Sequence, residues 1–263
     1  LEGKLVRSGG MVVKNVAGLD MGKLMIGSFG TLAAIATLNF KLLPIPEVSR
    51  TLLFQFEDLK SALALFEGIT KSGLNPIAAD VFNPILSALF SAQFGVKGFL
   101  LALRFGGNNA VIERCTREAA TLCGETGGSQ ILSLDEEQRF WNAVAALTPR
   151  HLEKFQDAAV VRISSPLSEC AGAFSTSDNA AHAMIASGIV RSWFSRTDAA
   201  SRWLASAAKR NWKGVIEFAG PRVNRSDLTL WPSPGGDFEI MKKIKHMFDP
   251  NGLLNRGRLH NLI

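Results

Sequence analysis

The chain has 263 residues, of which 47% are hydrophobic and 20% are charged, a composition typical of a globular protein with one or two domains and a substantial core. The net charge is +6, but apart from short clusters at 209–213 and 242–246 the basic residues are scattered, which argues against a nucleic-acid interface. The three cysteines, Cys115, Cys123 and Cys170, lack C-x-x-C spacing, which argues against a zinc site or disulfide framework and favours a reducing cytoplasm.

The first 46 residues are predicted to form a strand, a glycine-rich turn, a short helix, a second turn and another strand. Asp20 is a candidate N-cap for a helix over 21–25. The turn that follows, at 27–31, reads Gly-Ser-x-Gly-Thr and can present backbone amides and hydroxyls to a ligand. The apolar run at 32–40 predicts a buried strand.

The uncharged stretch at 24–40 is nearly long enough to span a bilayer, but its glycine, serine, threonine and asparagine residues favour a turn and a core strand. We therefore predict no membrane span, and no signal peptide is recognisable. Pro44 and Pro46 mark a domain boundary.

Beyond this boundary, strands and helices alternate. Strands are predicted at 51–56, 77–82, 98–105, 159–163, 189–194 and 214–218, and helices at 57–71, 83–90, 108–123, 134–147, 177–187, 198–209 and 238–248. The order strand, helix, strand, strand, helix indicates a ferredoxin-like α/β unit, and its recurrence predicts two related halves of one sheet. Residues 221–237 read as a loop. In the last helix the lysines of 242–246 are spaced as on a solvent-facing side.

The glycine-punctuated stretch at 9–32 has two interpretations. Glycines let a backbone approach a ligand closely, and amides at a short helix start favour an anion. The alternative is a plain glycine-rich turn between two core strands. The spacing of Gly27 and Gly30 does not match the G-x-G-x-x-G dinucleotide-binding motif.

Residues 9–46 resemble a segment of the FAD-linked oxidases of the vanillyl-alcohol oxidase type, which reads GG-x-x-x-KNVAGYD, then L-x-x-G-S-x-G-T-L-G-x-I, then K-L-x-P-x-P. Residues 248–258, FDPNGLLNRGR, are similar to the C-terminal FDPxGxxNPGK signature of that family. Within the family, the Lys-Asn-Val-Ala-Gly segment is most similar to the FAD-binding subunit of bacterial glycolate oxidases. These matches cover about one fifth of the chain, counting the residues of the quoted motifs.

The resemblance implies an α+β fold, with the C-terminal part of a vanillyl-alcohol-oxidase-type FAD-binding domain and a ferredoxin-like α/β cap domain with a mainly antiparallel sheet. Residues 1–46 would be the remnant of the FAD-binding domain, 47–237 the cap, and 238–263 a helix and tail that return to the FAD-binding domain. The FAD-binding residues implied by the resemblance are Asn15, Gly18, Gly27, Ser28, Gly30, Thr31, Ile35 and Asn255.

Three positions depart from the family pattern. Leu19 stands where the family has an aromatic residue, Ala33 replaces a glycine, and Arg256 replaces the proline of N-P-G. The last change puts the backbone beside Asn255 in doubt. In addition, no phosphate-cradling glycine-rich loop precedes Gly9, so we expect a chain that lacks the N-terminal half of the FAD-binding domain.

The four histidines do not form a metal-binding motif. His151, His182, His246 and His260 are far apart in the sequence and are expected at the surface, so no metal ligand is predicted. The catalytic relatives carry a histidine-rich metal motif that this chain lacks, and no catalytic base stands out.

The resemblance therefore implies an FAD-binding subunit of a glycolate (2-hydroxy acid) oxidase or dehydrogenase complex that holds flavin for electron transfer. Its partners would be a catalytic flavin subunit and an iron–sulfur subunit, in the cytoplasm or at the inner face of the membrane through those partners. The alternative is a non-catalytic scaffold or truncated remnant that binds partner subunits without its own flavin. A self-contained 2-hydroxy-acid dehydrogenase is disfavoured by the missing metal histidines.

Overall fold

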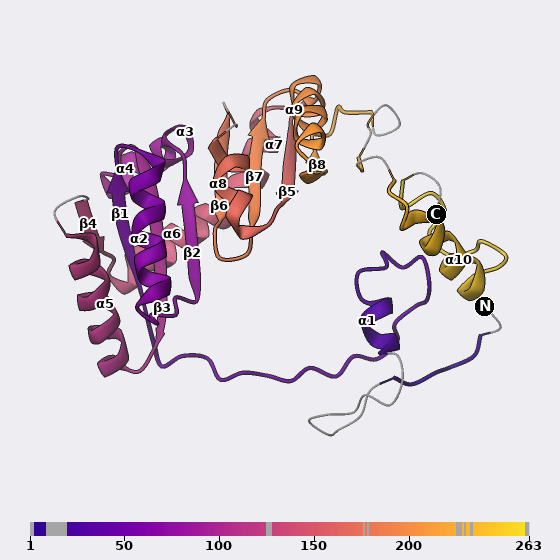
Figure 1. Cartoon of the computed structure of the whole chain (residues 1–263), viewed down its shortest axis with the longest axis horizontal. Helices are drawn as coiled ribbons and strands as arrows, with labels where there is room; N and C mark the ends of the chain where they lie inside the picture. Colours follow the sequence, from indigo (N-terminus) through magenta and orange to yellow (C-terminus); the bar gives the residue numbers. More distant parts are fainter. Residues whose placement is uncertain are drawn as a thin grey trace. The chain divides into compact units, whose positions relative to one another are not determined.

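The computed structural model describes residues 3–8, 20–124, 128–175, 177, 179–224, 228, 230–231, 234–260 and 263. Its contacts divide the chain into two compact units (Figure 1). Unit 1 comprises Leu1–Leu43 with Trp231–Ile263, and unit 2 comprises Pro44–Leu230. Assigning them to a flavin-binding domain and a cap stays a prediction.

Unit 2 contains strands and helices in alternation. The strands are β1 (Val48–Phe56), β2 (Ala78–Phe82), β3 (Phe99–Gly107), β4 (Gly128–Ile131), β5 (Ala159–Ser164), β6 (Ala180–Met184), β7 (Ile189–Phe194) and β8 (Lys213–Ala219). The helices are α2 (Leu59–Lys71), α3 (Pro84–Ser87), η1 (Ala88–Phe90), α4 (Ser91–Phe94), α5 (Asn109–Cys123), α6 (Leu134–Ala145), α7 (Leu147–Lys154), α8 (Leu167–Ser175) and α9 (Thr197–Lys209).

The described strands form one eight-stranded antiparallel sheet in the order β4-β1-β3-β2-β6-β7-β5-β8. Strands β5 to β8 follow a β-α-β-β-α-β course, and strands β1 to β4 follow the same course with the short helices α3, η1 and α4 inserted between β2 and β3. Each set has the ferredoxin-like spatial order. The sequence prediction of two related halves in one mainly antiparallel sheet is therefore confirmed.

The two halves join where β2 pairs with β6, and hydrogen bonds of the Asn83 side chain stabilise this pairing. Three pairs of residues form the β2–β6 register. The Asn83 side chain accepts from the backbone N–H of Ala181 at 3.1 Å and donates to the carbonyl of Asn179 at 2.6 Å. Its Oδ1 also accepts from Leu86 N at 3.0 Å, which caps α3. One buried side chain thus fixes both a helix start and the strand pairing.

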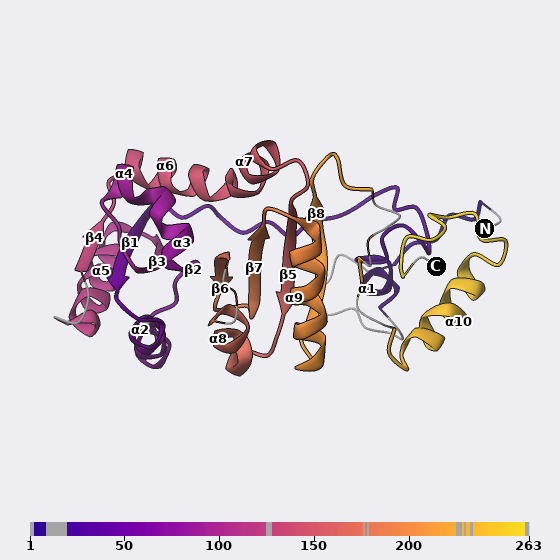
Figure 2. The ribbon, with the colours of Figure 1, turned by 90° about the horizontal axis from the view of Figure 1, so that it is seen from above.

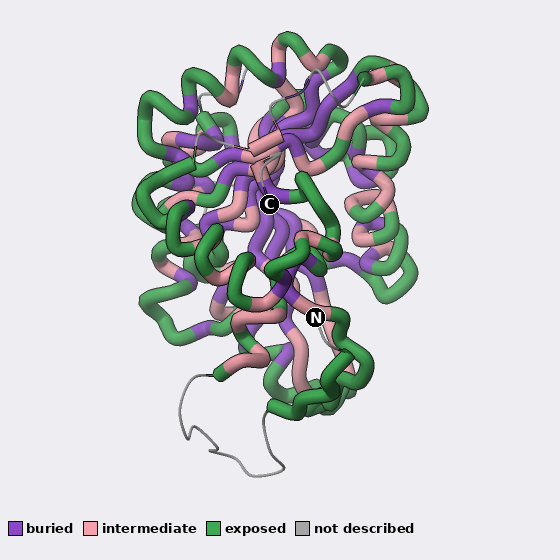
Figure 3. The backbone as a smooth tube through the Cα atoms, turned by 90° about the vertical axis from the view of Figure 1, so that its right-hand side faces the viewer, coloured by how far each residue is buried: buried purple, intermediate pink, exposed green. Residues whose placement is uncertain are grey.

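Each face of the sheet has its own core. Helices α2, α5, α8 and α9 pack on one face, and α3, η1, α4, α6 and α7 contribute to the core on the other (Figure 2). The burial pattern follows this layering, since the central strands are buried along much of their length (Figure 3). Four aromatic rings, Phe82, Phe90, Phe94 and Phe140, pack together in the second core, with centroids 5.2–6.0 Å from that of Phe140.

Three secondary-structure predictions are wrong. The strand expected at the start of the chain does not form at 3–8, the described residues of that stretch. The helix expected over 177–187 is strand β6, and the helix lies earlier, as α8. The alanine-rich composition favoured a helix, but pairing with β2 and β7 on both sides overrides that preference. The strand expected over 32–40 does not form, because residues 33–46 pair with no strand in the described part of the chain.

Unit 1 contains two described helices, α1 (Met21–Met25) and α10 (Phe238–Phe248), as the sequence predicts. Asp20 caps α1 by accepting from Lys23 N at 3.3 Å. A small core of Phe238, Leu259 and Ile263 packs with Trp231. None of the helices among the described residues is both long and apolar enough to cross a membrane.

Replacing Phe140 by alanine should strongly destabilise unit 2. The ring is fully buried among aromatic neighbours, so its removal leaves a cavity, and we expect the free energy of unfolding to fall by about 3–5 kcal/mol. Urea unfolding followed by circular dichroism measures this change. Leu134→Ala on the same helix, at a side chain 61% exposed, is the control and should stay within about 0.5 kcal/mol of the parent chain. Equal losses for both variants would contradict the described packing.

The apolar segment at 34–47 is exposed, with Phe40 at 76% and Leu42 at 83%. Unpaired backbone beside exposed apolar side chains favours association, so we expect the chain to self-associate with rising concentration. Replacing both residues by serine should shift the light-scattering mass toward the monomer, whereas Leu89→Ser, at a similarly exposed site, should not. A parent chain that stays monomeric at every concentration would count against this prediction.

Candidate functional site

The turn at 27–31 depends on two glycines with left-handed backbones, Gly27 at φ 83° and Gly30 at φ 69°. Thr31 closes the turn, because its backbone N–H and its hydroxyl both donate to the Ser28 carbonyl, at 3.0 and 2.7 Å. Thr31 is only 1% exposed. Within the described part of the chain, the amides of Phe29 and Gly30 donate to no backbone acceptor.

The C-terminal tail is bound to this turn through Lys245 of α10. Its Nζ donates to the carbonyls of Thr31 and Leu254, each at 2.8 Å, and lies 2.6 Å from Asp249 Oδ2. Asp249 in turn accepts from the backbone N–H groups of Leu253 and Leu254, at 2.9 and 2.7 Å. Lys245 of α10 thus joins the turn and the tail. The return of the tail to an FAD-binding domain stays a prediction.

The Lys245 ammonium holds the pKa of Asp249 well below its usual range, helped by the backbone N–H groups of Leu254 and Leu253. The Lys245 side chain is only 13% exposed and that of Asp249 is fully buried. The prediction that the lysines of α10 lie on a solvent-facing side is therefore wrong for Lys245. Its position four residues before Asp249 was the sequence signal that we missed.

Asn255 and Gly30 come together at the surface of this assembly. Asn255 Nδ2 donates to the Phe29 carbonyl at 2.7 Å, and the Asn255 backbone is itself left-handed, at φ 37°. A Cβ at position 30 would lie 2.7 Å from Asn255 Nδ2, too close for an unshifted contact. Arg256, which stands where the family pattern has a proline, donates from its side chain to the carbonyl of Gly252. This hydrogen bond links two positions of the tail that lie four residues apart.

Phe29, Asn255, Arg256 and Arg258 line an open hollow of about 380 Å³. Phe29 packs edge-on against Trp231 with ring centroids 5.3 Å apart, and the Arg258 guanidinium lies 6.0 Å from the Phe29 ring centroid. The hollow therefore combines two cations, an aromatic ring and an amide. Such a surface suits an anionic ligand that also has a planar ring.

The predicted site residues are only partly assembled. One segment, the turn at 27–31, contains four of them: Gly27, Ser28, Gly30 and Thr31. Asn255 contacts this turn by donating to the carbonyl of Phe29. Ile35 is 48% exposed and is not among the residues that line the hollow. Asn15 and Gly18 lie outside the described residues. Sequence reasoning did not select Phe29 or Arg258, although they lie at the variable position of the Gly-Ser-x-Gly-Thr motif and at the final position of the C-terminal signature. It also missed Trp231, which lies outside both motifs.

The expectation that the histidines lie at the surface is wrong for His182. It is 6% exposed, and its Nε2 lies 3.0 Å from Asp80 Oδ1. His151 is half-buried beside the Phe194 carbonyl, and burial lowers its pKa. In the described parts of the chain no group of three or more His, Cys, Asp or Glu side chains is placed to hold a metal ion.

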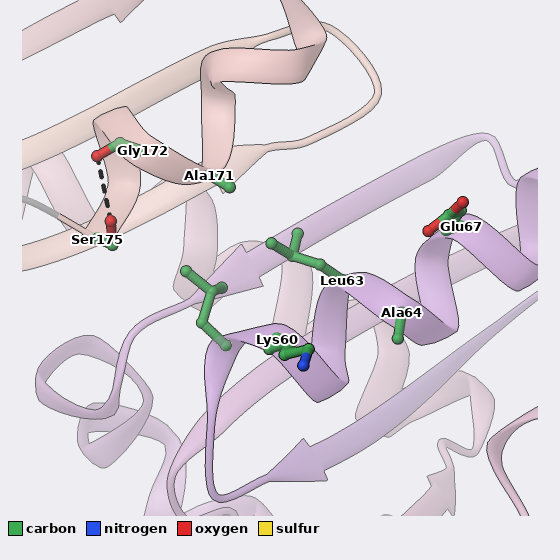
Figure 4. Close-up of a pocket in the computed structure, with 8 residues that line it drawn as sticks. Lys60, Leu63, Ala64, Glu67, Ala171, Gly172 and Ser175 are labelled. Atoms are coloured by element: carbon green, nitrogen blue, oxygen red, sulfur yellow. Dashed lines mark hydrogen bonds between the residues drawn. The ribbon is translucent and has the colours of Figure 1, made fainter.

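A second open hollow, of about 520 Å³, lies between α2 and α8 (Figure 4). Small and aliphatic side chains from both helices line it, with Lys60 and Glu67 on α2 and Ser175 on α8. The Ser175 hydroxyl is engaged with the Gly172 carbonyl at 3.2 Å. With few polar groups directed at one point, this groove offers little for catalysis.

Solved structures share the fold of this chain. The chain superposes on alkyldihydroxyacetonephosphate synthase with a TM-score of 0.61 at 14% identity, covering 92% of this chain and 51% of that one. It superposes on p-cresol methylhydroxylase with a TM-score of 0.58 at 14% identity, covering 85% of this chain and 55% of that one. At this identity the likeness shows the fold alone.

The family model for "FAD linked oxidases, C-terminal domain" matches residues 45–197 and 231–259. The chain belongs to this family, whose cofactor is FAD. It is 24% identical to glycolate oxidase subunit GlcD of Bacillus subtilis over 98% of the chain and 60% of that protein. It is 26% identical to the uncharacterized FAD-linked oxidoreductase Rv2280 of Mycobacterium tuberculosis over 97% of the chain and 61% of that protein.

A shorter match joins the chain to glycolate oxidase subunit GlcE of Escherichia coli, with 48% identity over 50 residues, which are 19% of the chain and 14% of that protein. The chain spans about three fifths of the length of its long matches, at 60% and 61%. The two guanidinium groups and the aromatic ring of the hollow have the chemistry that suits the phosphates and planar ring of FAD.

The ion pair of Lys245 and Asp249 should make unit 1 sensitive to acid. The native pKa of Asp249 lies below its unfolded value of about 3.9, so the pair stabilises unit 1 above that pH and less as the pH falls below it. We expect the NMR signal of the Trp231 indole, the single tryptophan of unit 1, to lose its native shift on acidification.

Asp249→Asn should weaken this pH dependence while lowering stability at neutral pH. Asp198→Asn is the matched control, because the pKa of Asp198 is lowered to about 2 by Arg196 and Arg202 in unit 2. The control should leave the acid transition of the Trp231 signal unchanged. An unchanged transition in Asp249→Asn would contradict the role of the buried pair.

Proposed function

We propose that this chain contributes the FAD-binding function of a 2-hydroxy-acid oxidase or dehydrogenase complex of the glycolate oxidase type. The observation that carries the proposal is the assembly of the glycine turn with the C-terminal tail through Lys245 and Asn255. The long match to a glycolate oxidase subunit and the short match to another support this choice of reaction.

The residues that would hold FAD are the turn at 27–31, Asn255, and the arginines of the hollow, Arg256 and Arg258. Asn15, Gly18 and Ile35 belong to the same proposal through the family resemblance. Turn amides and guanidinium groups suit the diphosphate, and Phe29 offers an aromatic face or edge to a ring. When bound, the flavin supplies the capacity to accept a hydride from the substrate.

The substrate of the complex would be a small 2-hydroxy acid. Two relatives are named as subunits of glycolate oxidase, which supports a partner that carries a catalytic flavin. An iron–sulfur subunit as the electron acceptor is part of the same proposal. We place the complex in the cytoplasm, or at the inner face of the membrane through its partner subunits.

The direct test is the visible spectrum of the purified chain with and without added FAD. We expect a structured, protein-bound flavin band that saturates with added FAD. Absence of any bound flavin would contradict FAD binding by this chain and favour the alternative, a non-catalytic scaffold that binds partner subunits.

Asn255→Ala should weaken FAD binding by about tenfold, the loss expected when one hydrogen bond that shapes the turn is removed. Asn251→Ala, another exposed asparagine of the same tail, is the matched control and should bind FAD as the parent chain does. Titration of flavin fluorescence measures both affinities. Equal affinities for the two variants would contradict a role for Asn255.

A further inference from the structure

A row of basic residues crosses one face of the sheet in unit 2. His182 on β6 pairs with Arg191 on β7, and Arg191 pairs with Arg162 on β5. Directly paired residues of neighbouring strands project from the same face of a sheet. The register therefore places an imidazole and two guanidinium groups side by side on three adjacent strands.

Glu217 on β8 supplies a single carboxylate between the two arginines. Arg191 donates to it through two nitrogens, with Nε at 2.7 Å from Oε2 and Nη2 at 3.3 Å from Oε1. Arg162 Nε lies 3.4 Å from Oε1. All three side chains are partly buried, with exposed fractions of 28%, 31% and 24% for Arg191, Arg162 and Glu217. The cluster has an excess of one positive charge in a partly desolvated setting.

The arginines retain donors for a further acceptor. Arg162 also donates through Nη1 to Ser164 Oγ at 2.8 Å. Within the described residues, no group accepts from Nη1 of Arg191 or Nη2 of Arg162. Two guanidinium groups around one carboxylate repel a metal cation, whereas their planar donors match the two oxygens of a carboxylate.

The other end of the row is rigid. The His182 ring stacks on Phe82 with centroids 4.6 Å apart and planes within 3°, and its Nε2 lies 3.0 Å from Asp80 Oδ1. These residues lie at the β2–β6 junction, where both Asp80 and His182 are 6% exposed. The bidentate partner on β8 restrains Arg191 before any ligand arrives, which lowers the entropy cost of binding.

A second arginine–carboxylate–arginine cluster in the chain provides a comparison. Asp198 lies 2.9 Å from both Arg196 and Arg202, but those arginines are 74% and 72% exposed. Water screens an exposed cluster of this kind, so it has little capacity to retain an anion. The difference in burial separates a binding site from an ordinary surface ion pair.

We propose that Arg162 and Arg191, oriented by Glu217, bind the carboxylate group of a small organic acid on this face of the sheet. The identity of that acid as a 2-hydroxy acid rests on the proposed function, whereas the binding of a carboxylate does not require FAD. The Ser164 hydroxyl beside Arg162 is placed to donate to the second polar group of such an acid.

The test is titration of the chain, without added FAD, with glycolate and separately with inorganic phosphate, followed by amide NMR shifts. Glycolate should produce saturable shifts on β5, β7 and β8. Arg191→Gln should weaken glycolate binding by about tenfold, and Arg162→Gln, which leaves the bond between Arg191 and Glu217 intact, should weaken it severalfold. Arg202→Gln, in the exposed cluster, should leave the affinity unchanged within about twofold.

The outcomes separate this inference from the proposed function. No saturable glycolate binding, or equal loss in Arg162→Gln and Arg202→Gln, overturns the carboxylate site even if the chain binds FAD. Phosphate binding as tight as glycolate binding overturns it too, since the cluster would then be an unselective cationic patch. Glycolate binding by a chain that binds no FAD supports the site and counts against the flavin role. If Arg191→Gln does not fold, the glycolate affinity of Arg162→Gln, compared with that of Arg202→Gln, decides whether the carboxylate site exists.

Discussion

Unit 2 depends on the short antiparallel pairing of β2 with β6. Three residue pairs join two four-stranded halves there, and the buried side chain of Asn83 connects the start of α3 to the carbonyl of Asn179 and the N–H of Ala181. The row of basic residues on the sheet begins at this junction, because His182 is part of the same register. A slip of one residue in β6 would turn the already buried His182 away from Asp80 and toward the apolar residues of the opposite face.

Much of this architecture could be predicted from local sequence. The helices after Asp58 and Asn108 begin where a side chain can accept from a backbone N–H three residues on. Prediction failed where distant partners decide the outcome. Residues 180–184 have the composition of a helix but fill a gap between two strands, and residues 32–40 have the composition of a strand but find no partner in the described part of the chain.

Of the two candidate sites, one could be predicted from sequence motifs and the other could not. The family motifs identified Gly30 and Asn255 as part of one site, and the structure joins them through the Phe29 carbonyl. No motif could identify Arg191 or Arg162, because they meet only through the register of β5 and β7 and the bulge that brings Glu217 of β8 to them. Periodicity gives the face on which a side chain lies, but pairing between strands decides its neighbours.

The joining of the two halves has a consequence for solubility. A separate half would end in β2 or β6, two strands with apolar side chains and unpaired backbone on one side, which are sites for aggregation. Fusion turns both into interior strands, and the edges left among the described strands are β4, only four residues long, and β8, which begins with Lys213 and contains Glu217. The internal duplication thus protects the sheet against edge-to-edge growth.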